Sequence, residues 1–165
     1  MGGRGEAADA GRGASPPGGQ VRNRVEVMHG VNLDALGRRS AEHYGTITLP
    51  ELELRIKRFA RELGLEVAFF QTNHEGEFVE HLHRLPEIAD GALVNAGAWT
   101  HYSYGIRDGL EIAALPAVEV HLSDVQSREE WRRRSVLEGV VIGVVSGKGP
   151  DGYSEALRML KDALG

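Results

Sequence analysis

The clearest strand signal in the sequence is the run Val118-Glu119-Val120-His121-Leu122-Ser123, in which apolar and polar residues alternate. Successive side chains of a strand point to opposite faces, so Glu119, His121 and Ser123 are predicted to share one side. A carboxylate two residues before a histidine can orient the ring and favour its charged form, as a proton donor needs. The run also fits a polar strand edge with only a structural role, and by itself it leaves both interpretations open.

Strand and helix signals alternate along the chain on both sides of this run. Strands are predicted over 24–28, 65–71, 91–95, 117–122 and 139–145, and helices over 48–63, 77–85, 104–114 and 152–164. Pro86 is predicted to stop the second helix, and the charges of 127–134 suit a helix dipole. The run 139–145 is nearly all apolar, which predicts a strand covered on both faces. Helices between strands imply right-handed crossovers and therefore a parallel sheet, an α/β fold.

Composition narrows the class of protein. Residues 1–20 are rich in glycine, alanine and arginine without apolar periodicity or a signal-peptide core, which predicts a disordered tail before a single domain over 21–165. A net charge of −5 and the lack of a basic stripe argue against a nucleic-acid partner. No apolar run reaches the length of a membrane span. The absence of cysteine excludes disulfides and thiolate metal sites and fits a cytoplasmic protein.

Polar residues follow four of the predicted strands at the edge where parallel sheets bind ligands. These clusters are His29 to Asn32, Asn73 to Glu75, Asn95 to His101, and His121 with Ser123. The loop from Gly37 to Gly45 contains Arg38, Arg39 and Tyr44. The glycines at its two ends can act as hinges, as in an active-site lid. A guanidinium close to a tyrosine favours the phenolate form. The sequence therefore predicts a site for an anionic small molecule at this edge.

Two further motifs are not assigned a function. Gly147 to Gly152 spells G-x-G-x-x-G, but no second strand or acidic residue follows it at the spacing of a dinucleotide site. His81 and His83 diverge by about 200° on a helix, so they do not form a metal pair. We expect no metal and no cofactor.

These motifs together resemble the type II 3-dehydroquinate dehydratases of the shikimate pathway over about residues 25–164. The matching segments are Asn32 with Arg39 and Tyr44, Asn73 to Gly76, Asn95 to His101, Glu119 to Ser123, Arg128 to Arg132, and Gly147 to Tyr153. The resemblance implies a flavodoxin-like three-layer sandwich around a five-stranded parallel sheet. It also implies a homododecamer, built as a tetramer of trimers, and a hydro-lyase. That enzyme converts 3-dehydroquinate to 3-dehydroshikimate by cofactor-free anti elimination of water through an enolate.

The resemblance also implies a role for individual residues. Tyr44 as phenolate removes the C2 proton beside Arg39, and Asn32 positions a water that stabilises the enolate oxygen. His121, oriented by Glu119, protonates the departing C1 hydroxyl. Substrate contacts are expected from the side chains or backbone of Asn95, His101, Leu122, Ser123 and Arg132. Asp108 resembles the acidic residue which, in that family, reaches the active site of a neighbouring subunit.

Several positions depart from the usual residues of that family. They are His29, Val31, Asp34, Ser40, Ala41, Asp124, Val136, Glu138 and Gly139, and none of them carries an implied chemical role. Two other functions therefore stay open beside the first. One is a divergent enzyme that dehydrates another cyclic β-hydroxyketone, and the other is a non-catalytic flavodoxin-like binding module.

Overall fold

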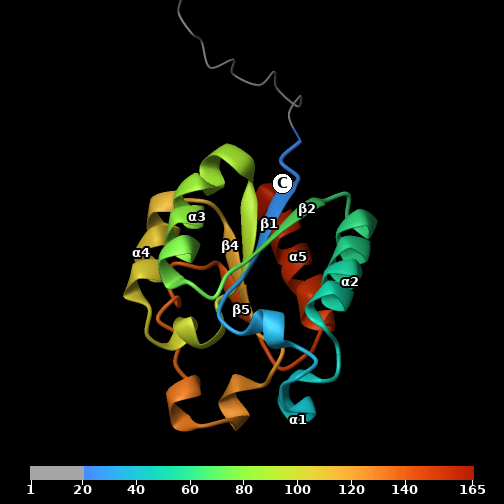
Figure 1. The fold of residues 1–165 in the computed structure, drawn as a ribbon. Coiled ribbons are helices and arrows are strands. Elements are labelled where there is room, and N and C mark those ends of the chain that lie inside the picture. Colours follow the sequence, from blue (N-terminus) through green and yellow to red (C-terminus); the bar gives the residue numbers. More distant parts are fainter. Residues whose placement is uncertain (1–20) are drawn as a thin grey trace, which may run out of the picture.

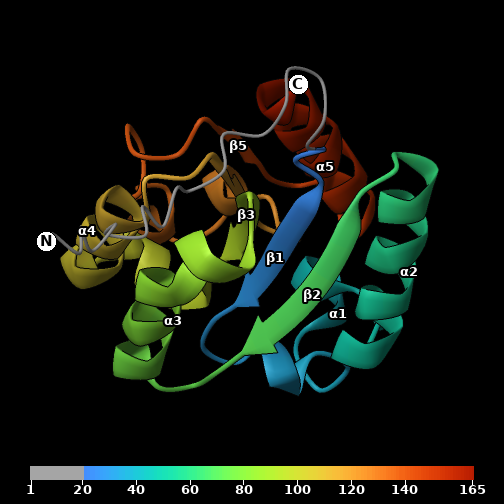
Figure 2. The same cartoon turned by 90° about the horizontal axis from the view of Figure 1, so that it is seen from above.

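The computed structural model describes residues 21–165, so the predicted tail over 1–20 lies outside the described residues. Five parallel strands form one sheet in the order β2-β1-β3-β4-β5. The strands are β1 (Arg24–His29), β2 (Glu66–Gln71), β3 (Gly91–Asn95), β4 (Ala117–Val120) and β5 (Gly143–Val145). Helices cover both faces, as Figures 1 and 2 show. The predicted α/β, flavodoxin-like fold is confirmed.

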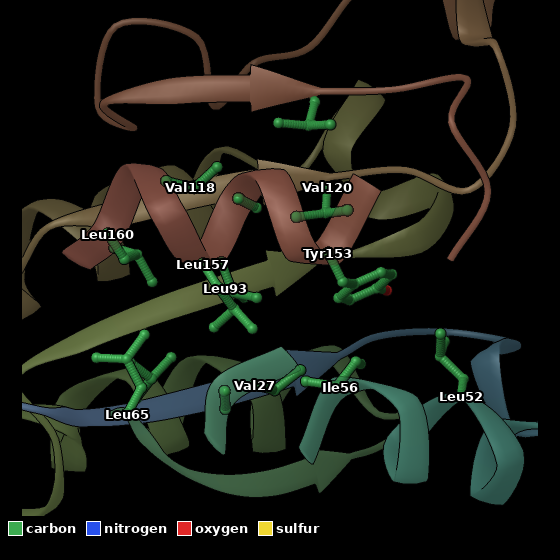
Figure 3. Packing of buried hydrophobic residues seen from close by; sticks show 14 of the residues in the cluster. Val27, Leu52, Ile56, Leu65, Leu93, Val118, Val120, Tyr153, Leu157 and Leu160 are labelled. Carbon is green, nitrogen blue, oxygen red and sulfur yellow. The ribbon is translucent and has the colours of Figure 1, made fainter. Parts of the chain in front are cut away.

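One face of the sheet packs against α2 (Leu49–Glu62) and α5 (Asp151–Leu164), and the other packs against α3 (Glu75–Ile88) and α4 (Tyr104–Ala113). On the first face, apolar residues at helical spacing on α2 and α5 meet the alternate residues of β1, β3 and β4 (Figure 3). They include Leu52, Ile56, Leu157 and Leu160 from the helices, and Val27, Leu93 and Val118 from the strands. None of the helices in residues 21–165 is long and apolar enough to cross a membrane.

The start of α2 shows how local sequence sets an element boundary. Thr48 is the N-cap, and its hydroxyl accepts a hydrogen bond from the Glu51 backbone N–H over 3.4 Å. The same hydroxyl donates to the Glu51 carboxylate over 3.0 Å, so the two side chains cap the helix together. Gly64 follows the helix in the left-handed region, with φ of 72°. The predicted helix is therefore confirmed with its capping residues.

Three sequence predictions were wrong in detail. α3 runs through Pro86 to Ile88, because a proline in the last turn removes only one backbone hydrogen bond of the helix. The segment 127–134 forms no α-helix but contributes to two 3₁₀ turns, Val125–Ser127 and Glu130–Arg132. The last strand, β5, is short and lies at the sheet edge, and Val144 is 47% exposed. An apolar run therefore does not mean burial on both faces here.

The ends of β1 and β3 are joined tightly at the edge that holds the polar clusters. The Gly30 N–H donates to the Asn95 carbonyl oxygen over 2.8 Å. A Cβ atom at Gly30 would lie 2.4 Å from the Ala96 carbonyl oxygen, so no larger residue fits without moving the backbone. This contact fixes the main chain on both sides of the site.

Candidate active site

A cavity lies at the carboxyl ends of β1, β3 and β4, where the sequence predicted a site. It brings together residues from the loop after β1, the short helix α1 (Ala41–Tyr44), the loop after β3 and the segment after β4. The predicted site residues that line it are Asn32, Arg39, Tyr44, Asn95, His101, His121, Leu122, Ser123 and Arg132. The residues that line this one cavity thus come from positions between Val31 and Arg132.

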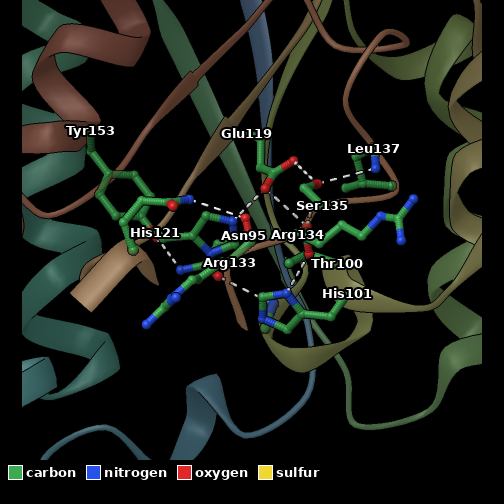
Figure 4. A network of polar contacts seen from close by, with 12 residues as sticks. Asn95, Thr100, His101, Glu119, His121, Arg133, Arg134, Ser135, Leu137 and Tyr153 are labelled. Atoms are coloured by element: carbon green, nitrogen blue, oxygen red, sulfur yellow. Dashed lines mark hydrogen bonds and ion pairs between the residues drawn. The ribbon is translucent and has the colours of Figure 1, made fainter. Parts of the chain in front are cut away.

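Glu119 and His121 form a buried pair at the back of this cavity (Figure 4). The His121 Nε2 atom lies 2.5 Å from Glu119 Oε2, and only 1% of Glu119 is exposed. The hydroxyl of Thr100 donates to the same carboxylate over 2.9 Å, and that of Ser135 donates over 2.6 Å. Both oxygens of the carboxylate are therefore satisfied inside the protein.

These contacts decide the charge of Glu119. Burial by itself would raise the pKa of this carboxyl, but the hydrogen bonds from His121, Ser135 and Thr100 and the charge of His121 outweigh that effect. They hold the pKa of Glu119 below its usual value, so the group is a carboxylate at neutral pH. A carboxylate fixed at Nε2 orients the ring and leaves Nδ1 for a substrate.

Tyr44, at the end of α1, contacts two arginines. The Arg39 guanidinium lies over its ring, 3.8 Å from the centroid, and Arg128 Nη1 donates to its hydroxyl over 2.5 Å. One guanidinium therefore covers the ring of Tyr44 and a second one donates to its hydroxyl. The sequence predicted the contact with Arg39. It missed Arg128 as a site residue, although that arginine begins the Arg128 to Arg132 motif.

We expect Arg128→Ala to lower kcat/KM by about 10- to 100-fold, because a hydrogen bond to a charged group contributes about 1.5–3 kcal/mol. Arg128→Lys keeps the charge without the planar fork and should recover only part of the loss. Steady-state kinetics on both variants measure this. Arg58→Ala, which removes an exposed arginine of α2, is the matched control. Equal activity of Arg128→Ala and the control would contradict a role for Arg128.

The loop that carries Asn32 is held by side chains. Asn32 has φ of 69°, and its backbone N–H donates to Asn73 Oδ1 over 2.8 Å. The Asn73 amide in turn donates to Asp34 Oδ2 over 3.0 Å. Asp34, one of the departures from the usual family residues, therefore helps to fix the loop. Asparagine tolerates the left-handed backbone conformation better than most residues.

The remaining predicted binding residues surround the cavity with mixed polarity. His101 Nδ1 lies 2.7 Å from the Arg134 carbonyl oxygen, and burial lowers the pKa of His101, so its ring is neutral at pH 7. The Arg132 guanidinium lies over the Trp131 ring, 4.1 Å from the centroid. The Arg132 Nε atom lies 2.8 Å from Glu129 Oε2 and forms an ion pair with it, but the angle is not that of a hydrogen bond. The cavity thus offers a guanidinium for an anion and neutral groups for hydroxyls.

Asp108 does not line the cavity of its own chain. It lies on α4, where its side chain is exposed. Its predicted role in a neighbouring subunit stays a prediction. In residues 21–165, no group of three or more histidine, cysteine, aspartate or glutamate side chains could hold a metal ion.

Comparison with known proteins places these features in a family. The model of the family described as dehydroquinase class II matches residues 23–161. A 3-dehydroquinate dehydratase of Syntrophotalea carbinolica is 51% identical over 131 residues, which cover 79% of this chain and 88% of that protein. One of Pelobacter propionicus is 46% identical over 86% of this chain and 95% of its own length. The crystal structure of the type II dehydroquinase of Butyrivibrio crossotus superposes with a TM-score of 0.82 at 37% identity, covering 86% and 99% of the two chains.

Proposed function

This chain belongs to the class II dehydroquinase family, and we propose that it removes water from 3-dehydroquinate to form 3-dehydroshikimate. The observation that carries the proposal is the pairing, in one cavity, of a tyrosine held by two guanidiniums with a histidine held by a buried carboxylate. Such a pair supplies a base and an acid, which are the two groups that an elimination of water needs.

The first step is removal of a proton from C2 of the substrate. Tyr44 as phenolate takes this proton, and the electron pair of the C–H bond moves toward the C3 carbonyl to form an enolate. Arg128, through the hydroxyl, and Arg39, over the ring, keep the phenolate available before the transfer. Asn32 positions the water that stabilises the enolate oxygen, which is an electrostatic contribution to the transition state.

The second step expels the C1 hydroxyl. The enolate collapses to a conjugated enone, the C1–O bond breaks, and His121 gives a proton to the departing oxygen so that it leaves as water. Glu119 holds the ring in place and stabilises its positive charge before the transfer. Base and acid come from different elements, the lid and the end of β4, which allows them to act on opposite faces of the substrate ring.

Binding of the substrate follows the polarity of the cavity. Its carboxylate is recognised by positive charge, including Arg132, and by backbone groups next to Leu122. Its ring hydroxyls are recognised by Asn95, His101 and Ser123. We place this reaction in the cytoplasm, since a chain without cysteine suits a reducing compartment.

The homododecamer, a tetramer of trimers, is part of the proposal. Asp108 is exposed on α4 and lies outside the cavity of its own chain, so it can serve a site only in a neighbouring copy. Exposed apolar side chains on the described surface, including Trp131 at 52% and Val144 at 47%, suit burial between copies.

The test is the appearance of the conjugated enone, followed by ultraviolet absorbance, when purified protein is mixed with 3-dehydroquinate. We expect saturable turnover that a metal chelator does not change. A folded protein that forms no enone from 3-dehydroquinate would contradict the proposal. Turnover of a different cyclic β-hydroxyketone at a much higher kcat/KM would point instead to the divergent enzyme.

A further inference from the structure

Three buried residues from three elements form a chain of hydrogen bonds behind the cavity. His29 is the last residue of β1, Asn95 is the last residue of β3, and Tyr153 lies in the first turn of α5. The His29 Nε2 atom lies 3.0 Å from the Tyr153 hydroxyl, and Asn95 Nδ2 donates to the same hydroxyl over 3.1 Å. His29 and Tyr153 are fully buried, and of the three only Asn95 lines the cavity. Figure 4 labels Asn95 and Tyr153.

The surrounding contacts determine where the protons lie. The Gly97 backbone N–H donates to Asn95 Oδ1 over 3.2 Å, so the oxygen of that amide faces Gly97 and the nitrogen faces Tyr153. The Tyr153 oxygen accepts from Asn95, and we assign its proton to His29 Nε2, because the opposite tautomer would leave the Tyr153 O–H without an acceptor. A neutral imidazole that accepts at Nε2 carries its proton at Nδ1.

The environment keeps this chain uncharged. Burial lowers the pKa of His29 to about 4, and burial raises the pKa of Tyr153 above its usual value. Both groups are therefore neutral at pH 7. Within the described residues, His29 Nδ1 is buried and has no hydrogen-bond partner. An apolar side chain at position 29 would avoid the free-energy cost of burying this unpaired nitrogen.

Building on the proposed function, we propose that His29 and Tyr153 are positioning residues, which hold the Asn95 amide so that its second N–H is directed to a hydroxyl of the substrate. The main chain of Asn95 is already fixed through Gly30, and one N–H, from Gly97, contacts the amide oxygen over 3.2 Å, so the amide nitrogen still needs a partner to hold the side chain in this orientation. A rotated amide would present its oxygen in place of its N–H. The relay His29–Tyr153–Asn95 prevents this exchange by giving the amide nitrogen an acceptor.

The relay predicts a change in substrate binding more than in the chemical step. Tyr153→Phe keeps the packed ring but removes the acceptor, and we expect KM to rise about tenfold, the effect of one lost hydrogen bond. The value of kcat should fall by less than about threefold, since Asn95 contacts the substrate in both the ground state and the transition state. His29→Leu should show the same split between KM and kcat.

A double variant separates positioning from stability. In His29→Leu/Tyr153→Phe both polar partners are gone, so neither is left buried and unpaired, and the melting temperature should recover relative to Tyr153→Phe. KM should stay high. Ile56→Val, which trims the same core without touching the relay, is the control for a small loss of stability. A KM that returned to the wild-type value in the double variant, or that rose equally in Ile56→Val, would overturn the proposal.

The tautomer of His29 tests the relay in the unmodified protein. Nitrogen NMR of the histidine rings should show a neutral ring protonated at Nδ1, assigned by its loss in His29→Leu or His29→Asn. A ring protonated at Nε2, or a charged ring, at pH 7 would overturn the relay. This measurement does not depend on turnover. A wild-type protein that fails to dehydrate 3-dehydroquinate would therefore contradict the proposed reaction and still leave the tautomer as the test of the relay.

Discussion

Tyr44→Phe is expected to lower kcat by at least about a hundredfold, the usual scale for a positioned base. The variant removes only the oxygen that takes the C2 proton. Its ring still fills the space under Arg39, so the cavity should keep its shape and KM should change little. Stopped assays of enone formation over hours, with wild-type protein diluted to match, measure a loss of this size.

Tyr104→Phe is the matched control for Tyr44→Phe. Tyr104 lies at the start of α4, is 65% exposed and does not line the cavity, so removal of its hydroxyl should leave kcat unchanged. A Tyr44→Phe protein that kept more than a tenth of the wild-type kcat would rule out Tyr44 as the base. Arg39 and Arg128 would then bind the substrate without acting through the tyrosine.

His121→Ala is expected to abolish dehydration nearly as completely, because hydroxide is a poor leaving group at neutral pH. Exchange of the C2 proton with solvent deuterium should persist, since His121 takes no part in the formation of the enolate. Glu119→Gln should also be severely impaired, because the neutral amide stabilises the charged ring less than the carboxylate does. Mass spectrometry of the recovered substrate measures exchange, and ultraviolet absorbance measures dehydration.

The pair should behave as one unit. Glu119 acts through His121, so the double variant His121→Ala/Glu119→Gln should lose no more activity than the more impaired single variant. Glu62→Gln, at the exposed end of α2, controls for the loss of a carboxylate. A double variant that lost the full product of the two single effects would show that Glu119 and His121 act independently.

The parts of the fold that sequence patterns predicted are those with strong local signals. β3 was predicted with its observed bounds because a short apolar run, Ala92 to Val94, lies between a glycine and a polar residue that starts a loop. The end of α3 was not, because the effect of Pro86 depends on its distance from the end of the helix. β5 was predicted too long, because a run of apolar residues does not reveal that one side of the sheet ends there.

Contacts between side chains of the site were predicted where the two residues are close in sequence and missed where they are far apart. Glu119 and His121 are two residues apart on alternating positions, so their contact follows from strand geometry. Arg128 and Tyr44 are separated by 84 residues, and no local pattern links them. The bond from Asn95 to Tyr153 spans 58 residues and needs the crossover to α5. Such contacts depend on the assembled sheet.

The most direct test of the central claim, anti elimination by Tyr44 and His121, uses 3-dehydroquinate labelled with deuterium at C2. In one substrate the label is anti to the C1 hydroxyl, and in the other it is syn. We expect the wild-type protein to form unlabelled 3-dehydroshikimate from the anti-labelled substrate and labelled product from the syn-labelled one, as measured by mass spectrometry. Retention of deuterium from the anti position, with its loss from the syn position, would contradict the account.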